Sequence, residues 1–419
     1  MHVCQRWRQI VSASPHRLQL KIHCTYGALR GDLGIWPALP IVIDCGFVSF
    51  WTISGNVIAA LEHSDRVCYV SFGIEDPILG RTAKAMQKPF PVLTHLRIRA
   101  PNGTAPALPA EFLGGSAPSL QEIYLYGIPF PALPTLLLSA SDLVTLELDK
   151  IPPNGYISPE AMVAGLAALH RLKILEIEFQ LAPRRSDRIN SSPPPITRTV
   201  LPALTSFQFQ GASEYLEDLV ARIDTPQLRE IVIKLLNQLA DFQVLQLSKF
   251  LDRSVGLRLT LLRHAHVVFS NEGVAFVKWP APRFMDYMPE HPIILISCQG
   301  MDWQISHLAH VLSQFSATLS NVVHLDINAD ALSFRLEGMD DTEWLPLLQQ
   351  FPTVQTLRVH ERELAKRIAL ALEDITAVMV AQVLSSLDSI YLAGQPASSI
   401  EKFVALRQLS GRPVTVKNT

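Results

Sequence analysis

The sequence predicts an α/β solenoid in which each stacked repeat supplies one strand of a parallel sheet and one helix or irregular segment on the opposite side. Three observations lead to this prediction. An apolar motif recurs along most of the chain, its copies are quasi-regularly spaced, and helix-like stretches lie between them. The 419 residues are 48% hydrophobic and 18% charged, which is too apolar for disorder and sufficient for a core.

The recurring motif is an apolar residue followed by two more, three and five positions later, often after a proline. This L-x-x-L-x-L pattern, at intervals near ~20–29 residues or somewhat longer, is the signature of leucine-rich repeats. Two weaker copies, at Leu262 and Ile293, fill a long interval in the series. The clear copies begin at Val67, Leu93, Leu120, Leu143, Leu172, Leu204, Leu228, Val322, Val354 and Leu387.

The last two apolar residues of each copy are two positions apart, so on a strand they share one face. Stacking buries each strand and its covering segment against the neighbouring repeats, which a single repeat cannot do alone. The copies lack the regular asparagine or cysteine that usually forms a buried ladder, so a strand-and-helix stack is predicted rather than a smooth horseshoe. Helices are expected between strands at residues 55–62, 159–166, 214–221 and 377–384, where the apolar spacing is helical.

The predicted solenoid covers residues 36–397 and is interrupted by a polar, proline- and arginine-rich loop at 182–200. Asp187 dilutes the arginines of this loop, which favours a solvated loop over a nuclear-import or phosphate-binding patch. Residues 398–419 are expected to form a C-terminal cap. The Ser398-x-x-Glu401 capping box predicts the start of an amphipathic helix there.

Charge and cysteine usage restrict the class of partner. A formal net charge of -2 gives no global field that would recruit nucleic acid. The five cysteines occur singly, as expected for reduced thiols. The sequence has neither a signal-peptide core nor an apolar stretch of membrane-spanning length. We therefore expect a cytoplasmic or nuclear protein with a protein partner and with neither nucleic acid nor membrane as a ligand.

An enzyme is the main competing class, and the sequence does not support it. The phosphate-binding, dinucleotide-binding, nucleophile-elbow and zinc-protease motifs are all missing. His264 and His266, with Cys298, are the nearest approach to a metal set, but they lack ligand spacing. The sequence therefore predicts no catalytic residues, no metal and no cofactor, although residues from distant parts of a fold can converge.

The residues that flank the inward apolar pairs should line the exposed, concave face of the sheet. A basic rung is followed by a tyrosine rung and then by an acidic patch, which favours a basic segment of a partner with Tyr124 and Tyr126 as anchors. The alternative is that these charges only keep the face solvated. The predicted partner-binding residues are His95, Arg97, Arg99, Glu122, Tyr124, Tyr126, Glu147, Asp149, Glu176, Glu178, Asp326 and Arg358.

Residues 1–20 contain a short amphipathic helix that ends at Ser14-Pro15. Its signature residues are Val3, Cys4, Arg6, Trp7 and Arg8, which resemble the final part of an F-box. The chain as a whole is similar to fungal F-box-like leucine-rich-repeat proteins. That resemblance implies a ubiquitin ligase adaptor of the SCF type, in which the F-box docks on the adaptor subunit of a cullin ubiquitin ligase and the repeats recognise the substrate.

The sequence departs from the F-box pattern because the leucine-proline turn and the two helices expected before Trp7 are missing. The first hypothesis is a non-catalytic protein-interaction scaffold that recognises substrates for such a ligase. The alternative hypothesis is a repeat scaffold that binds protein partners and has no ubiquitin-ligase role.

Overall fold

The structure is a computed structural model that divides into two compact units. Unit 1 comprises Met1–Asp187 with Thr199–Leu204, and unit 2 comprises Arg188–Arg198 with Thr205–Thr419. Two of the three boundaries between the units, after Asp187 and after Arg198, fall within the predicted 182–200 loop, of which residues 197–200 are described, and the third follows Leu204. The structure describes residues 5–6, 22–24, 39–45, 56–73, 76–101, 105–181, 197–236, 244–257, 263–270, 274–278, 294–299, 304–329 and 343–417.

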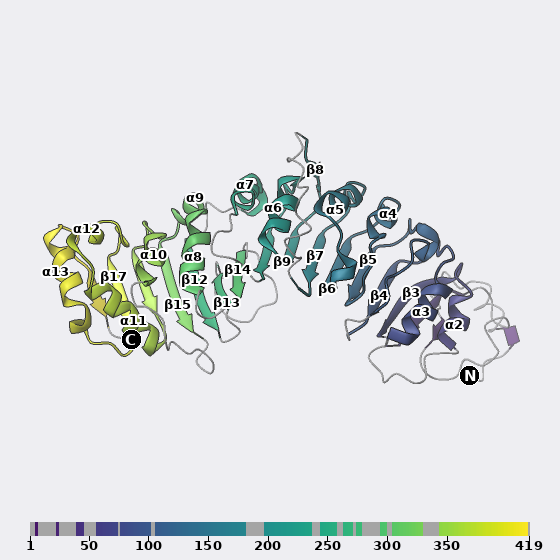
Figure 1. Cartoon of the computed structure of the whole chain (residues 1–419), viewed down its shortest axis with the longest axis horizontal. Helices are drawn as coiled ribbons and strands as arrows, with labels where there is room; N and C mark the ends of the chain where they lie inside the picture. Colours follow the sequence, from purple (N-terminus) through teal and green to yellow (C-terminus); the bar gives the residue numbers. More distant parts are fainter. Residues whose placement is uncertain are drawn as a thin grey trace. The chain divides into compact units, whose positions relative to one another are not determined.

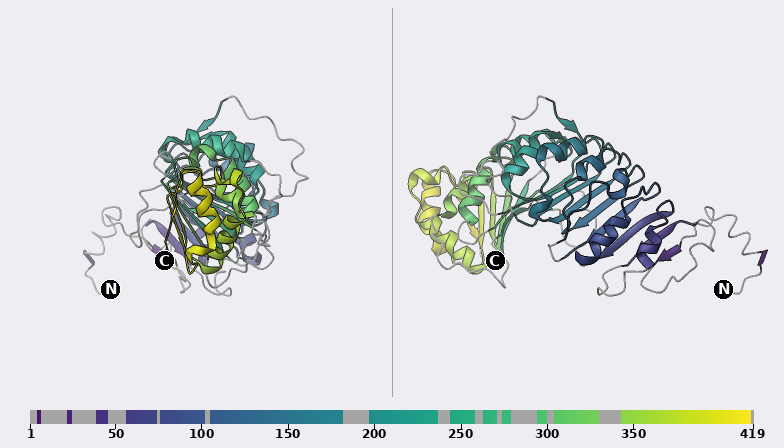
Figure 2. Two further views of the ribbon diagram at one scale, coloured as in Figure 1. Left: turned by 90° about the vertical axis from the view of Figure 1, so that its left-hand side faces the viewer. Right: turned by 45° about the vertical axis from the view of Figure 1, so that its right-hand side comes forward.

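Unit 1 contains one parallel sheet whose strands follow chain order, as the repeat pattern predicts (Figure 1). The sheet consists of β1 (Ile22–Cys24), β2 (Ile41–Asp44), β3 (Val67–Gly73), β4 (His95–Arg99), β5 (Glu122–Tyr126), β6 (Thr145–Ile151) and β7 (Ile174–Phe179). The connecting segments contain α2 (Asn56–Leu61), α3 (Asp76–Ala85), η1 (Phe112–Gly115), α4 (Leu133–Leu137), η2 (Pro153–Gly155) and α5 (Pro159–Leu166), and β8 (Thr199–Val200) occupies the last two residues of the predicted 182–200 loop. The helices cover one side of the sheet (Figure 2).

The motif residues of successive strands lie side by side and form two buried rows. Each of these side chains is at most 3% exposed, so the predicted inward face is confirmed. Burying large apolar side chains contributes about 1.5–3 kcal/mol each, and this makes every repeat depend on its neighbours. The first row is Val70, Leu96, Ile123, Leu146 and Leu175, and the second is Phe72, Ile98, Leu125, Leu148 and Ile177.

In the clear copies from Leu93 onward, the first apolar residue closes a turn that leads into the strand. The Leu93 amide donates to the Phe90 carbonyl at 3.2 Å. Pro91, directly after Phe90, has the φ that the second residue of such a turn prefers. The following amide then bonds the preceding repeat, as Thr94 N does to Cys68 O at 2.9 Å. In unit 1 these backbone bonds hold successive repeats together without an asparagine ladder.

Unit 2 repeats the same strand-and-helix scheme and ends in the segment predicted as a cap. Its sheet order is β9-β11-β14-β13-β12-β15-β16-β17-β18. The strands are β9 (Ser206–Gly211), β11 (Glu230–Leu235), β12 (His264–Ser270), β13 (Val274–Lys278), β14 (Ile294–Gln299), β15 (His324–Ala329), β16 (Thr356–Val359), β17 (Ser389–Leu392) and β18 (Thr415–Lys417), with a short β10 (Ile223–Asp224). Its helices are α6 (Ser213–Ala221), α7 (Leu245–Arg253), η4 (Val255–Leu257), α8 (Gln304–Ser313), α9 (Ser316–Leu319), α10 (Trp344–Gln349), α11 (Arg362–Glu373), α12 (Ala377–Val380), η7 (Ala397–Ile400) and α13 (Glu401–Leu409).

The prediction of an entirely parallel sheet in chain order is wrong at the two weak copies. Both copies form strands, β12 and β14, but β13 lies between them and is antiparallel to each. As a result β14 pairs with β11, and β12 pairs with β15. The sheet of unit 2 is continuous through this antiparallel meander, although the strand order is reversed there.

The helix predictions at 55–62, 159–166 and 214–221 are confirmed by α2, α5 and α6. The helix predicted at 377–384 is shorter and ends at Val380. Leu384, whose carbonyl accepts the Leu387 amide in the turn before β17, has a left-handed φ of 47°, and this backbone conformation is incompatible with a continuing α-helix.

The predicted capping box at Ser398 and Glu401 is wrong. A short 3-10 helix precedes α13, so the N-cap position falls on Ile400, which makes no side-chain capping bond. The carboxylate of Glu373 in α11 accepts the Lys402 amide at 3.1 Å instead. The cap of α13 is therefore supplied by the preceding repeat.

Of the predicted F-box-like helix, Gln5 and Arg6 are described as helical and exposed. The other signature residues, Val3, Cys4, Trp7 and Arg8, lie outside the described residues. Within the described part of the chain, no helix combines the length and apolarity needed to cross a membrane.

Candidate binding face

Side chains on the side of the unit 1 sheet opposite the core form one continuous polar surface, which we call the charged face. Strand register sets its composition, because Arg97, Tyr124, Glu147 and Glu176 are paired across β4 to β7. Asp326 and Arg358, also predicted for the binding surface, lie on strands of unit 2 and are not part of it. The charged face consists of His95, Arg97, Arg99, Glu122, Tyr124, Tyr126, Glu147, Asp149, Glu176 and Glu178, all partly or fully exposed.

The basic side of the charged face is largely engaged within the protein. Arg97 forms an ion pair with Glu122, and His95 Nε2 lies 3.8 Å from the same carboxylate. The Arg99 guanidinium lies 5.4 Å from the ring centroid of Tyr124 and 5.1 Å from that of Tyr126. These cation–π contacts hold both tyrosine rings in place beside the acidic side of the face, which consists of Glu147, Asp149, Glu176 and Glu178.

A pocket opens where the basic and acidic sides meet. Its volume is about 210 Å³, which is smaller than the roughly 300–1,000 Å³ usual for small-molecule and cofactor sites. The pocket is therefore large enough for one side chain of a larger ligand but not for a whole cofactor. Its lining comprises Ser71, Phe72, Gly73, Arg97, Arg99, Tyr124 and Glu147.

A β-bulge in β6 shapes the acidic side. The register with β7 shifts between Leu148 and Ile151, and Lys150 has a left-handed φ of 51°. A bulge sets two residues against one and redirects their side chains. Here Lys150 Nζ reaches 2.5 Å from Glu178 Oε1. Lys150 belongs to the site but was not predicted, because an alternating strand pattern does not reveal a bulge.

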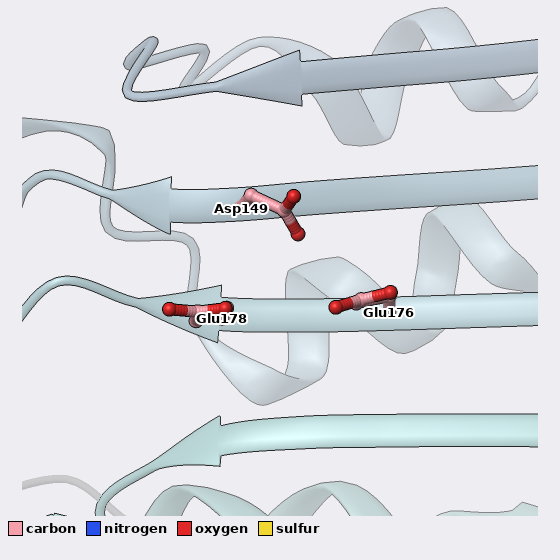
Figure 3. Close-up of side chains that lie close together, drawn as sticks. All are labelled: Asp149, Glu176 and Glu178. Carbon is pink, nitrogen blue, oxygen red and sulfur yellow. The ribbon is translucent and has the colours of Figure 1, made fainter. Parts of the chain in front are cut away.

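Three carboxylates converge next to this bulge. Figure 3 shows Asp149 on β6 beside Glu176 and Glu178 on β7, and one oxygen from each lies within 4.8 Å of the others. Burial, together with the charges of Asp149, Glu147 and Glu178, raises the pKa of Glu176 to about 7. Burial and neighbouring carboxylates also raise the pKa values of Glu147 and Asp149. The cluster therefore holds more negative charge than its surroundings offset.

Carboxylate oxygens at this separation are compatible with a hard divalent cation. However, Glu178 already pairs with Lys150, and Asp149 is hydrogen-bonded to Tyr124, so two of the three groups are engaged. We therefore treat the three carboxylates as part of the charged face rather than as a metal centre. Of the predicted histidine set, His264 stacks on the ring of His324 with 4.5 Å between centroids.

Comparison with known proteins adds little to this description. No family model matches the chain, and no curated protein matches it. Among solved structures, the leucine-rich repeat-containing protein LegL7 from Legionella pneumophila is 12% identical, with 83% of this chain and 91% of that chain covered and a TM-score of 0.28. So low a TM-score has no bearing on fold or function. The class of the protein, an α/β repeat protein with an L-x-x-L-x-L core, follows from its own strands.

Proposed function

We propose that this chain is a non-catalytic protein-interaction scaffold whose unit 1 holds a basic segment of a partner protein against the charged face. The observation that carries the proposal is the arrangement on neighbouring strands. Two tyrosines fixed by Arg99 lie directly beside Glu147 and Asp149, and Glu176 on the next strand lies beside Glu147.

Charge supports a basic ligand. The acidic side has four carboxylates, and Lys150 offsets part of their charge through Glu178. Arg97 does not offset it fully because it pairs with Glu122. A lysine or arginine brought next to Glu176 would stabilise the ionised carboxylate, whose pKa is otherwise raised. Complementary charge of this kind mainly contributes steering and specificity.

Shape supports an extended peptide rather than a small molecule. With strands ~4.8 Å apart, the distance across β4 to β7 is about 14 Å, which four extended residues at ~3.3 Å each would span. The pocket beside Arg97, Tyr124 and Glu147 has the size of one side chain. Tyr124 and Tyr126 are partly buried and fixed by Arg99, which is the character of aromatic residues that dominate binding energy.

The test is fluorescence anisotropy of the full chain with a labelled lysine- and arginine-rich peptide and a matched peptide in which glutamine replaces each basic residue. We expect binding of the basic peptide only. The double variant Glu147→Gln/Glu176→Gln should bind the basic peptide at least about fivefold more weakly, since each lost charge pair contributes up to ~1 kcal/mol of binding free energy. The control Glu62→Gln/Glu111→Gln removes the same charge from exposed positions outside the strands. Equal binding of the two peptides would refute the proposal.

We also propose that the scaffold serves as the substrate-recognition part of an SCF-type ubiquitin ligase. The support is the F-box-like signature Val3, Cys4, Arg6, Trp7 and Arg8, in which Arg6 is helical and exposed. The test is a pull-down of the chain with the purified adaptor subunit of a cullin ubiquitin ligase, with Trp7→Ala as the comparison. Binding that Trp7→Ala abolishes supports the ligase role. Failure to bind favours the alternative scaffold without that role and leaves the proposed peptide-binding face unaffected.

A further inference from the structure

A second polar surface occupies the last strands of unit 2, with the opposite charge. Arg358 of β16, Tyr391 of β17 and Lys417 of β18 are paired in register, so they stand next to one another on adjacent strands. Arg358 and Lys417 are exposed, and Tyr391 is partly exposed. We call this surface the cationic rung.

The two cations of the cationic rung converge on one aromatic ring. The Arg358 guanidinium carbon lies 5.2 Å from the Tyr391 ring centroid, and Lys417 Nζ lies 5.3 Å from it. Lys417 also donates a hydrogen bond to the Tyr391 hydroxyl at 3.2 Å. Their backbones are two strand spacings, or about 10 Å, apart, so both long side chains lean toward the tyrosine between them.

Neither cation is paired with an acid in the part of the chain that the structure describes. Among the described residues, no carboxylate lies within 4.0 Å of the charged nitrogens of Arg358 or Lys417. The register neighbour of Arg358 is Asp326, whose Oδ1 lies 3.4 Å from Nε2 of His360. The basic groups of unit 1 differ in this respect, because Arg97 and Lys150 each pair with a glutamate.

The neighbouring row of the same face adds hydrogen-bonding groups and no acid. This row, which runs across β12 and β15 to β18, consists of His264, His324, Thr356, Ser389 and Thr415. All five side chains are exposed or partly exposed. A ligand on this part of the sheet therefore meets hydroxyl and imidazole groups next to the two cations of the cationic rung.

We propose that the cationic rung binds an acidic segment of a protein partner, with one carboxylate seated over Tyr391 between Arg358 and Lys417. Arginine and carboxylate form charge-assisted, often bidentate, hydrogen bonds, which gives this contact its specificity. A carboxylate at this place would also relieve the mutual repulsion of the two cations. This site is separate from the charged face of unit 1 and does not depend on the function proposed there.

The test is fluorescence anisotropy of the full chain with a labelled peptide in which glutamate alternates with glycine, and with a matched peptide carrying glutamine for glutamate. We expect the glutamate peptide alone to bind, and binding to weaken as salt increases because exposed charges are screened. The variant Arg358→Gln/Lys417→Gln should bind at least about fivefold more weakly. The control Lys366→Gln/Lys402→Gln removes two exposed positive charges from helices α11 and α13.

Equal binding of the two peptides, or unchanged binding in the Arg358→Gln/Lys417→Gln variant, would overturn the proposal. A single-stranded oligonucleotide that displaces the glutamate peptide and loses affinity in the same variant would also overturn it, in favour of a nucleic-acid surface. Circular dichroism and thermal unfolding of each variant show that it is folded. The conservative variant Arg358→Lys should retain charge but lose bidentate geometry, and we expect intermediate affinity.

Discussion

Oε1 of Glu217 accepts a hydrogen bond from the backbone amide of Leu247 at 2.8 Å, and Oε2 accepts one from Gln246 at 2.6 Å. Glu217 lies in α6, and the amides belong to the first turn of α7 in the next repeat. The first four amides of a helix have no partner within it, so they need one from outside. Here that partner comes from the preceding repeat, and stacking and helix capping are therefore coupled.

Replacing this cap should destabilise the chain. We expect Glu217→Ala to lower the free energy of unfolding by about 1–2 kcal/mol, since two partly buried amides lose their acceptor. Urea denaturation followed by circular dichroism measures the change. Asp252→Ala, at an exposed position on the same α7, is the matched control and should have little effect. Equal loss in both variants would contradict the capping role.

Stability should also depend on pH through Glu217. Burial raises its pKa to about 7, even though the two amide hydrogen bonds act in the opposite direction. An unfolded glutamate titrates near ~4.3, so between these values the folded state binds more protons, and the Glu217 contribution to stability decreases as pH rises. The difference in unfolding free energy between the parent chain and Glu217→Gln should thus shrink or change sign from pH 5 to pH 8. A difference that grows in favour of the parent over that range would contradict this sign.

Binding of a basic peptide to the charged face should have the opposite pH dependence. Glu176 has a pKa of about 7, raised by burial and by its acidic neighbours, so it is largely protonated at pH 6 and ionised at pH 8. We expect tighter binding at pH 8, by up to about tenfold if Glu176 loses one full interaction. Fluorescence anisotropy at pH 6 and pH 8 measures the change in affinity. In the Glu176→Gln variant, most of the pH dependence of peptide binding should disappear. An unchanged pH profile in that variant would mean that other groups cause the dependence.

One close approach between repeats should tolerate no side chain. Gly127, directly after β5, has a φ of 67°, and a Cβ there would lie 2.2 Å from the Ala100 carbonyl oxygen. Gly115 has a similar φ of 71° but nothing within 4 Å of such an atom. Alanine at either of these positions should lower the free energy of unfolding by about 1 kcal/mol because of the left-handed backbone. Gly127→Ala should lower it clearly more because its Cβ would also clash with the Ala100 carbonyl oxygen. Thermal unfolding of both variants measures the difference, and equal losses would contradict it.

Much of the fold was predictable because the motif encodes burial. In each clear copy all three apolar residues are buried, and the second and third, for example Leu96 and Ile98, fix both the strand and its register. That register then determines the opposite row, which is why the ten residues of the charged face could be placed from the sequence. Whether they bind a partner remains a prediction.

The remaining features depend on information outside the repeat pattern. The antiparallel β13 is a short run of β-forming residues, Val274–Lys278, and only Asn271, Glu272 and Gly273 separate it from β12. Such a spacing indicates a hairpin, and this signal is not part of the L-x-x-L-x-L repeat pattern. The bulge at Lys150 gave no comparable signal, because its left-handed backbone is occupied by a lysine and not by the glycine or asparagine that usually marks such a position.

The reversed strand order around β13 limits how such a chain can evolve in length. Where consecutive strands are neighbours in the sheet, as in β3 to β7 or β15 to β17, duplication of one gene segment adds one strand and leaves the other pairings intact. Between β11 and β15 a duplicated segment would separate β14 from β11 or β12 from β15. Related chains should therefore gain or lose repeats on either side of residues 263–299 and retain a fixed number within them.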